Sequence, residues 1–318
     1  MRDPISIYRY SLVSRSALNS RSEKVEHQGA LIRVGDGDYG YGCIHPWPEL
    51  VDLDLEETLG RLKMGETTPL IRQALHCAAR DAEARRKGVS LFDGLEVPLS
   101  HATVELDKES FVAAWGAGFK TVKVKVGKDL VADWDRLVSL AYAFPDFRWR
   151  LDFNHSCSLR EVEGFLRSLG DSLCGKIDFI EDAWGEEDTP GSHVLGVALA
   201  VDRSVMSQAE DFPVSVVKPA RDELEEVLER VYAEEGRVVI TSYMDHPIGQ
   251  SYAAWQAGLA MAKYPSMVDS CGLITHGLFE PDAFTECLGN ATPHFHPAPG
   301  TGLGFDDLLE SMTWTPLV

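Results

Sequence analysis

The sequence predicts an α/β protein whose larger part is a barrel of parallel strands, preceded by a smaller α+β unit. After about residue 95, short apolar runs alternate with segments of helical periodicity, which is the pattern of repeated β-α-β units. Seven or more such units in series predict a sheet that closes on itself. A doubly wound open sheet is the alternative. It normally carries a glycine-rich phosphate loop after its first strand, and the sequence has none there.

The N-terminal part has the pattern of an antiparallel sheet followed by helix. Three β-rich segments, at 6–12, 30–34 and 36–42, are separated by polar and glycine-containing turns, which is a hairpin signal. From 53 to 87 the apolar residues recur at helical spacing, and Gly88 just beyond them is a candidate helix C-cap. We therefore expect antiparallel strands packed against an amphipathic helical stretch.

The rest of the chain supplies the barrel. Its predicted strands lie at 97–100, 121–126, 149–153, 177–181, 197–201, 214–217 and 237–241. Helical segments alternate with them at 107–117, 129–143, 158–171 and 221–235. The final stretch, rich in proline and glycine from 293 to 304, is expected to be irregular and to return to the N-terminal unit.

The composition excludes several classes of partner. The chain has 30 basic and 50 acidic residues, a net charge of −20, whereas nucleic acids and anionic membranes need a basic surface. No apolar run reaches the roughly 20 residues that span a bilayer, and the N-terminus lacks the apolar core of a secretory signal. The six cysteines are scattered without a CxxC motif, which favours reduced thiols in a cytoplasmic protein. The oligomeric state stays open, with a monomer as one option.

Charged residues stand at the ends of the apolar runs, and the first two are lysines. Lys123 and Lys125 are two residues apart on one strand, so their side chains leave the same face. Neighbouring ammonium groups lower each other's proton affinity, which is a route to a lysine base near neutral pH. A solvated strand face is the alternative. It is weakened by the apolar residues at the alternate positions, which a barrel strand needs on its helix-covered side.

Three carboxylates close three further strands. Asp152, Glu181 and Asp202 each follow an apolar run, and oxygen ligands of this kind suit Mg²⁺, which keeps several waters. A single acid after a strand is more often a helix N-cap, but three on successive strands favour a ligand set. Asn154, two residues after Asp152, is a candidate for supporting a ligand or contacting a substrate.

A third lysine stands on the opposite side of the predicted barrel mouth. Lys218 ends the next strand, and Pro219 directly after it favours an extended end and a turn. A base on one side, with a metal and a cation on the other, suits removal of a proton next to a carboxylate. Such a mouth would accept a small carboxylate as substrate.

These motifs, in this order and spacing, resemble the enolase superfamily and within it the muconate-lactonizing subgroup. They read TVKVKVG, RLDFN, DFIED, AVDRS and VVKP. The resemblance implies a modified (β/α)7β TIM barrel at 96–290, with a capping domain built from 1–95 and from a C-terminal return at 291–318. It departs from the family's usual pattern at Arg203, where a glutamate is common after the third acid.

The resemblance also implies a role for each residue. Lys125 would be the base with Lys123 beside it, and Lys218 would stabilise the enediolate. The carboxylates Asp152, Glu181 and Asp202 would bind Mg²⁺, with Mn²⁺ as the alternative, and the substrate contacts would be Asn154, Ser242 and Gly249. The implied reaction is the dehydration of a succinylated cyclohexadiene carboxylate in menaquinone biosynthesis. A racemase or cycloisomerase using the same lysines, and a non-catalytic binding barrel, are the alternatives.

Four further residues could suggest other sites. Asp245 and His246 resemble the histidine base of another branch, but that branch also needs an aspartate where Lys218 stands, so we expect a surface loop. His294 and His296 have the spacing of metal ligands without a third partner. We expect them in a packed or solvent-facing loop.

Overall fold

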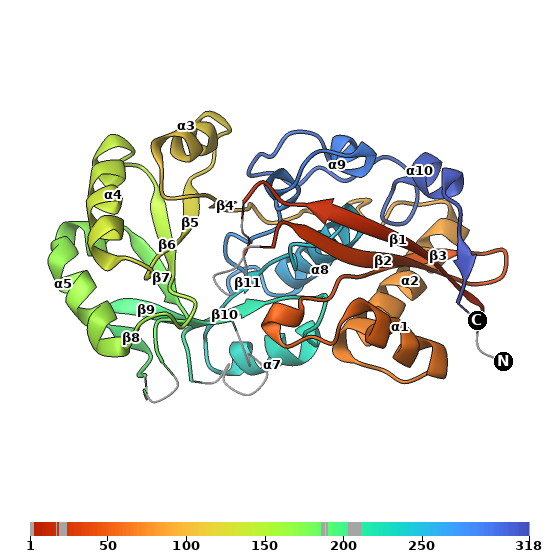
Figure 1. The fold of residues 1–318 in the computed structure, drawn as a ribbon, viewed down its shortest axis with the longest axis horizontal. Helices are drawn as coiled ribbons and strands as arrows, with labels where there is room; N and C mark the ends of the chain where they lie inside the picture. The colour runs from red at the N-terminus through yellow and green to blue at the C-terminus, as the bar shows by residue number, and fades with distance from the viewer. Residues whose placement is uncertain are drawn as a thin grey trace.

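The computed structural model describes residues 3–16, 18, 24–185, 188, 190–202 and 211–317. It consists of a small antiparallel sheet covered by two helices and a larger curled parallel sheet with helices on its outside (Figure 1). The predicted α/β fold is therefore confirmed. Arg203 lies outside the described residues, so the departure noted there has no structural account.

The antiparallel sheet forms near the β-rich segments that the sequence predicts at the N-terminus, but the third strand lies at 40–44 and not at 36–42, because residues 35–38 form the turn before it. Strands β1 (Ile5–Val13), β2 (Glu26–Val34) and β3 (Gly40–Ile44) pair in that order. A fourth strand, β12 (Thr315–Pro316), comes from the C-terminal end and pairs with β1. The last residues of the chain thus lie beside the first strand.

Two helices, rather than one continuous stretch, cover this sheet. Helix α1 (Leu55–Met64) ends at Gly65, whose positive φ of 76° favours glycine. Helix α2 (Pro69–Lys87) begins anew because Thr68 accepts a hydrogen bond from the backbone at its N-terminus and proline fits the first helical position. Gly88 caps α2 in the left-handed conformation, as predicted.

The parallel sheet curls into the barrel. In sheet order its strands are β11 (Arg237–Ile240), β10 (Val214–Val217), β9 (Val197–Val201), β7 (Ile177–Glu181), β6 (Arg148–Asp152), β5 (Thr121–Lys125) and β4 (Ala102–Thr103), with β8 (His193–Val194) antiparallel to β9. Residues 267–272 join the two ends, since they hydrogen-bond to β11 on one side and to 99–101 on the other. The first barrel strand, β4, lies later than the predicted 97–100, because Ser100 forms only an isolated bridge with Cys271 and no strand ladder.

Helices pack on the outside of the barrel, as α3, α4 and α5 do beside β5, β6 and β7 in Figure 1. The described helices are α3 (Lys108–Gly116), α4 (Leu130–Ala143), α5 (Leu159–Cys174), α7 (Leu224–Ala233), α8 (Pro247–Lys263), α9 (Ala283–Leu288) and α10 (Asp306–Ser311), with short 3-10 turns at Pro48–Leu50 and His276–Leu278. In the described ranges none of them has the length and apolar character needed to cross a bilayer.

The strands' N-terminal end is closed by an ion-pair network inside the barrel. Asp178 accepts hydrogen bonds from Arg150 Nε at 2.9 Å and from Arg237 Nη1 at 3.0 Å. Burial raises the pKa of Asp178, but the two guanidinium groups outweigh burial and hold it below its usual value. Arg150 also donates to the carbonyl of Ser270 at 2.7 Å. The network therefore ties β6, β7 and β11 to the closing segment.

Candidate active site

Strand register brings the predicted site residues together at the C-terminal ends of the barrel strands. Lys125 lies directly opposite Asp152 on the neighbouring strand, and Asp152 lies directly opposite Glu181 on the next. Asp202 follows the end of β9 and Lys218 follows the end of β10. In a parallel barrel these ends open into one mouth, which is where barrel enzymes carry their catalytic groups.

The Lys123 ammonium lies between two of the carboxylates. Its Nζ is 2.6 Å from Glu181 Oε1 and 3.1 Å from Asp152 Oδ2. Burial lowers the pKa of Lys123, but the neighbouring acids, including Asp202, outweigh burial and raise it. Lys123 is therefore a fixed cation, and not the lysine suited to act as a base.

The other two charged strand ends form a second ion pair. Lys218 Nζ donates to Asp202 Oδ1. Burial raises the pKa of Asp202, but Lys218 and Lys123 outweigh it and hold the pKa below its usual value. For Glu181, burial together with the nearby acids raises the pKa despite Lys123. Two buried carboxylates and the partly buried Asp202 thus face two ammonium groups, and Glu181 is the carboxylate whose pKa is raised.

This donor set fits a hard divalent cation chemically. In the described part of the chain, no three His, Cys, Asp or Glu side chains are arranged as a metal site, and the Lys123 and Lys218 ammonium groups contact the carboxylates. The fit rests on the donor set itself, because Asp152, Glu181 and Asp202 stand at the C-terminal ends of three neighbouring strands. Carboxylate oxygens are the ligands that Mg²⁺ prefers.

Lys125 differs from Lys123 in facing a cavity. It lines a space of about 370 Å³ whose other walls come from α3, the segment before it and the loops near 244 and 274–278. Its Nζ donates to the carbonyl of Leu18. Burial lowers the pKa of Lys125, Asp152 raises it by a smaller effect, and Lys123 lowers it further. A lysine of lowered pKa at a cavity wall can accept a proton.

The N-terminal segment that covers this cavity was not predicted from the sequence. Arg15 and Ser16 line the cavity; the Arg15 backbone N–H donates to Leu278 O at 2.9 Å, and Ser16 Oγ donates to Glu105 at 3.1 Å. Besides Lys125, Arg15 is the basic side chain among the described lining residues. The sequence did not predict that Arg15 lines the cavity, because this placement depends on contacts with residues far along the chain.

The three predicted substrate contacts have different surroundings. Asn154 stands at the mouth with a φ of 49°, and its backbone N–H donates to Asp152 Oδ1 at 3.0 Å. Ser242 is buried with its hydroxyl 2.6 Å from Thr275 Oγ1. Gly249 lies in α8 where a Cβ atom would collide with the Asp245 carboxyl. None of the three lines the cavity that Lys125 faces, so their contact with substrate stays a prediction.

One expectation about the loops is wrong. Asp245 and His246 are buried rather than on a surface loop, because the start of α8 packs beneath the antiparallel sheet. The His246 ring lies 4.7 Å from that of Tyr10, and burial raises the pKa of Asp245 to about 7. His294 and His296 are exposed, as expected for a solvent-facing loop.

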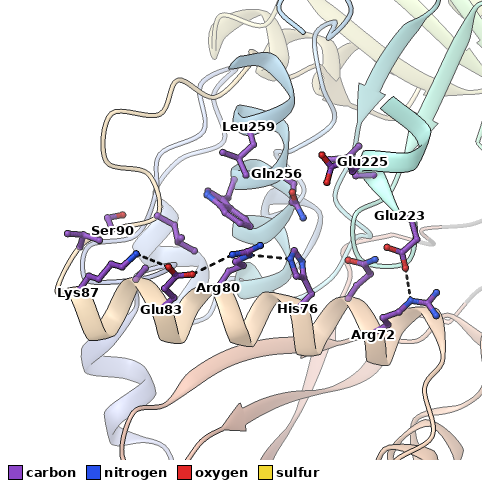
Figure 2. Close-up of a pocket in the computed structure, with 16 residues that line it drawn as sticks. Arg72, His76, Arg80, Glu83, Lys87, Ser90, Glu223, Glu225, Gln256 and Leu259 are labelled. Carbon is purple, nitrogen blue, oxygen red and sulfur yellow. Dashed lines mark hydrogen bonds and ion pairs between the residues drawn. The ribbon is translucent and has the colours of Figure 1, made fainter. Parts of the chain in front are cut away.

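A larger cavity of about 670 Å³ lies away from the strand ends, between α2, α7 and α8 (Figure 2). Figure 2 shows that charged side chains along α2 line it, and that they pair with one another and with the segment before α7. Arg72 contacts Glu223 at 2.6 Å and Lys87 contacts Glu83 at 2.7 Å. None of the predicted site residues lines this cavity, so it is not the candidate active site.

Two sequence comparisons with known proteins agree on one family. Residues 5–84 match the family model described as O-succinylbenzoate synthase, N-terminal domain. The chain is 35% identical over 327 aligned positions to an o-succinylbenzoate synthase from Bdellovibrio bacteriovorus, covering 98% of each chain. Among solved structures, a dipeptide epimerase from Enterococcus faecalis complexed with Mg and a dipeptide has a TM-score of 0.80 at 16% identity, covering 96% of this chain and 99% of the epimerase. A mandelate racemase/muconate lactonizing protein from Herpetosiphon aurantiacus has a TM-score of 0.77 at 18% identity, covering 96% of this chain and 98% of that one. At these identities the two structures show a shared fold.

Proposed function

The chain belongs to the o-succinylbenzoate synthase family, and we propose that its Lys125 acts as the base in that family's reaction. The reaction is the dehydration of 2-succinyl-6-hydroxy-2,4-cyclohexadiene-1-carboxylate to 2-succinylbenzoate, so the enzyme is a carbon–oxygen lyase. Its partner is this small carboxylate. A cytoplasmic location stays a prediction.

The observation that carries the proposal is the contrast between the two neighbouring lysines. Lys123 is held between two carboxylates with a raised pKa, whereas Lys125 faces the cavity with a lowered pKa. A base needs to be neutral before it can accept a proton, and it needs access to the substrate. Of this pair, Lys125 has the lowered pKa and the access to the cavity, which supports its assignment as the base.

Each step then follows from residues at the mouth. Neutral Lys125 takes the proton from the carbon next to the ring carboxylate, and the C–H electrons move into the carboxylate as an enediolate. The Lys218 ammonium, on the other side of the mouth, stabilises this negative charge. The Lys125 ammonium then gives its proton to the departing hydroxyl, the C–O bond breaks, and water leaves. The ring becomes aromatic, which drives the reaction forward.

We propose Asp152, Glu181 and Asp202 as the residues that would hold Mg²⁺, with Mn²⁺ as the alternative ion. When bound, the ion supplies positive charge that stabilises the carboxylate as the proton leaves. Their position at the C-terminal ends of three neighbouring strands supports this assignment. The Lys123 ammonium, which contacts Asp152 and Glu181, would hold these two carboxylates in position.

The direct test is the product formed from the cyclohexadiene carboxylate with Mg²⁺, followed by NMR. We expect 2-succinylbenzoate from the wild type, and loss of that product in Lys125→Ala. Full turnover by Lys125→Ala would contradict the assignment of the base. Racemisation of N-acyl amino acids with no aromatic product would instead favour the related racemase reaction.

A further inference from the structure

The turn that carries Lys218 is tightly fixed by its own residues. The Lys218 backbone N–H donates to Asp222 Oδ2 at 2.7 Å. Its carbonyl accepts from the backbone N–H groups of Arg221 at 2.9 Å and Asp222 at 2.8 Å. Both main-chain groups of Lys218 are therefore held by residues three and four positions later, so a movement of this turn moves Lys218 with it.

The same turn is hydrogen-bonded to the N-terminal unit through one hydroxyl group. Tyr243 OH donates to Asp52 Oδ2 at 2.8 Å and accepts from Arg221 Nη1 at 3.4 Å. Arg221 Nε lies 3.7 Å from Asp222 Oδ1, the residue that caps Lys218. Burial raises the pKa of Tyr243, so its hydroxyl is protonated near neutral pH and can donate. A continuous polar contact chain thus runs from Asp52 to the Lys218 turn.

Asp52 is itself held in place, so the chain has a fixed end. The Trp47 backbone N–H donates to Asp52 Oδ2 at 2.9 Å, and the Trp47 indole donates to the Tyr243 carbonyl at 2.8 Å. Trp47 and Tyr243 belong to one buried apolar cluster that includes Leu12, Leu70 and Phe279. This cluster joins the N-terminal unit to the barrel loops, and it would keep Asp52 and Tyr243 in register.

We propose that Asp52, Tyr243 and Arg221 are positioning residues through which the N-terminal unit orients Lys218 to stabilise the enediolate. The proposal rests on the role of Lys218 in the proposed function. We assign them an action through the turn, because Tyr243 links Asp52 to Arg221 and Arg221 contacts Asp222, which holds Lys218. The N-terminal unit then contributes to the rate of the reaction as well as covering the cavity.

The variant that tests this is Tyr243→Phe, which removes the hydroxyl and keeps the ring in its apolar cluster. Displacing a reacting group by about 1 Å can cost about 100-fold in rate, so we expect kcat to fall by roughly 10- to 100-fold with KM little changed. Tyr252→Phe is the matched control. Tyr252 is also buried, and its hydroxyl donates to Gln73 at 3.2 Å and lies 2.7 Å from His76 Nδ1, at the other cavity. We expect it to lower the melting temperature and leave kcat unchanged.

A second measurement reads the position of Lys218 without turnover. Acetylation of Lys218 by acetic anhydride, at one pH and without substrate or metal, is followed by mass spectrometry. We expect faster labelling of Lys218 in Tyr243→Phe and in Asp52→Ala, and no further increase in the double variant, because both changes break the same chain. Labelling in Tyr252→Phe should match the wild type.

Two outcomes overturn the proposal. In one, Lys218 labelling and kcat of Tyr243→Phe equal those of the wild type. In the other, Tyr252→Phe loses as much kcat as Tyr243→Phe, which would show a general structural effect. If the wild type forms no 2-succinylbenzoate, the proposed function fails, and the labelling comparison alone decides whether the chain positions Lys218.

Discussion

Replacing Lys123 by methionine is expected to make folding stability depend strongly on Mg²⁺. The Lys123 side chain is 15% exposed and contacts Glu181, whose side chain is 2% exposed, and Asp152, whose side chain is 9% exposed. Methionine keeps the length of the side chain and removes its charge. The two acids would then be buried without their cation, so the variant should be less stable than the wild type when no metal is present.

The size of the loss follows from the burial of this pair. Removing one partner of a buried ion pair costs about 3–5 kcal/mol. Because Glu181 has a raised pKa and can take up a proton, we expect the lower end, about 3 kcal/mol. At about 2–4 °C per kcal/mol this lowers the melting temperature by roughly 6–12 °C. A bound divalent ion at about 100 times its Kd returns about 2.7 kcal/mol, most of that loss.

The assay is thermal unfolding of wild type and Lys123→Met in EDTA and in excess Mg²⁺. Lys87→Met is the matched control, because Lys87 pairs with Glu83 on the surface, with 62% of its side chain exposed, and such pairs contribute about 1 kcal/mol or less. The reasoning is refuted if Lys123→Met unfolds at the wild-type temperature in EDTA. It is also refuted if Mg²⁺ raises the melting temperatures of the variant and the wild type equally.

Three other predictions concern the base, the cavity and the far end of the barrel. Because burial lowers the pKa of Lys125 below 10.5, kcat/KM should fall as the pH falls through that lowered pKa and Lys125 becomes protonated. A plot of kcat/KM against pH that shows no such decrease would contradict the assignment of the base. Arg15→Met should raise KM with kcat little changed, measured by steady-state kinetics, because Arg15 supplies positive charge to the cavity for a substrate with two carboxylates; an unchanged KM would contradict this. Asp178→Asn should lower stability by about 3–5 kcal/mol in denaturant titrations at pH 7 and leave kcat unchanged, because it strands the buried Arg150. The pKa of Asp178 in the folded protein lies below its usual 3.8, so the ionised carboxylate stabilises the fold above pH 3.8. That stabilisation is lost as the pH falls through the lowered pKa. Equal stability of Asp178→Asn and the wild type at pH 7 would contradict this prediction.

The sequence predicted the barrel and the positions of its charged strand ends because both depend on local pattern. Alternating apolar residues define a strand, and parallel strands must open their C-terminal ends into one mouth. For that reason Lys125, Asp152 and Glu181 could be predicted as neighbours before their register was known. Their roles as base and metal ligands stay predictions.

The features that sequence reasoning missed depend on contacts between distant residues. Arg15 and Leu18 reach Lys125 and its cavity from a turn more than a hundred positions earlier, and no local pattern encodes that. Burial of His246 depends on where the antiparallel sheet docks on α8. The break between α1 and α2 did have a local signal, since Gly65 can end a helix and a threonine–proline pair can begin one.

The rate of 2-succinylbenzoate formation by Lys125→Ala, beside the wild type and with saturating Mg²⁺, tests the central claim most directly. General acid–base catalysis by one group contributes about 100- to 10,000-fold, and Lys125 is assigned both the proton removal and the proton return. We therefore predict a loss of at least roughly 100-fold in kcat with the fold intact, judged by an unchanged melting temperature. A variant that folds and turns over at the wild-type rate would contradict the account.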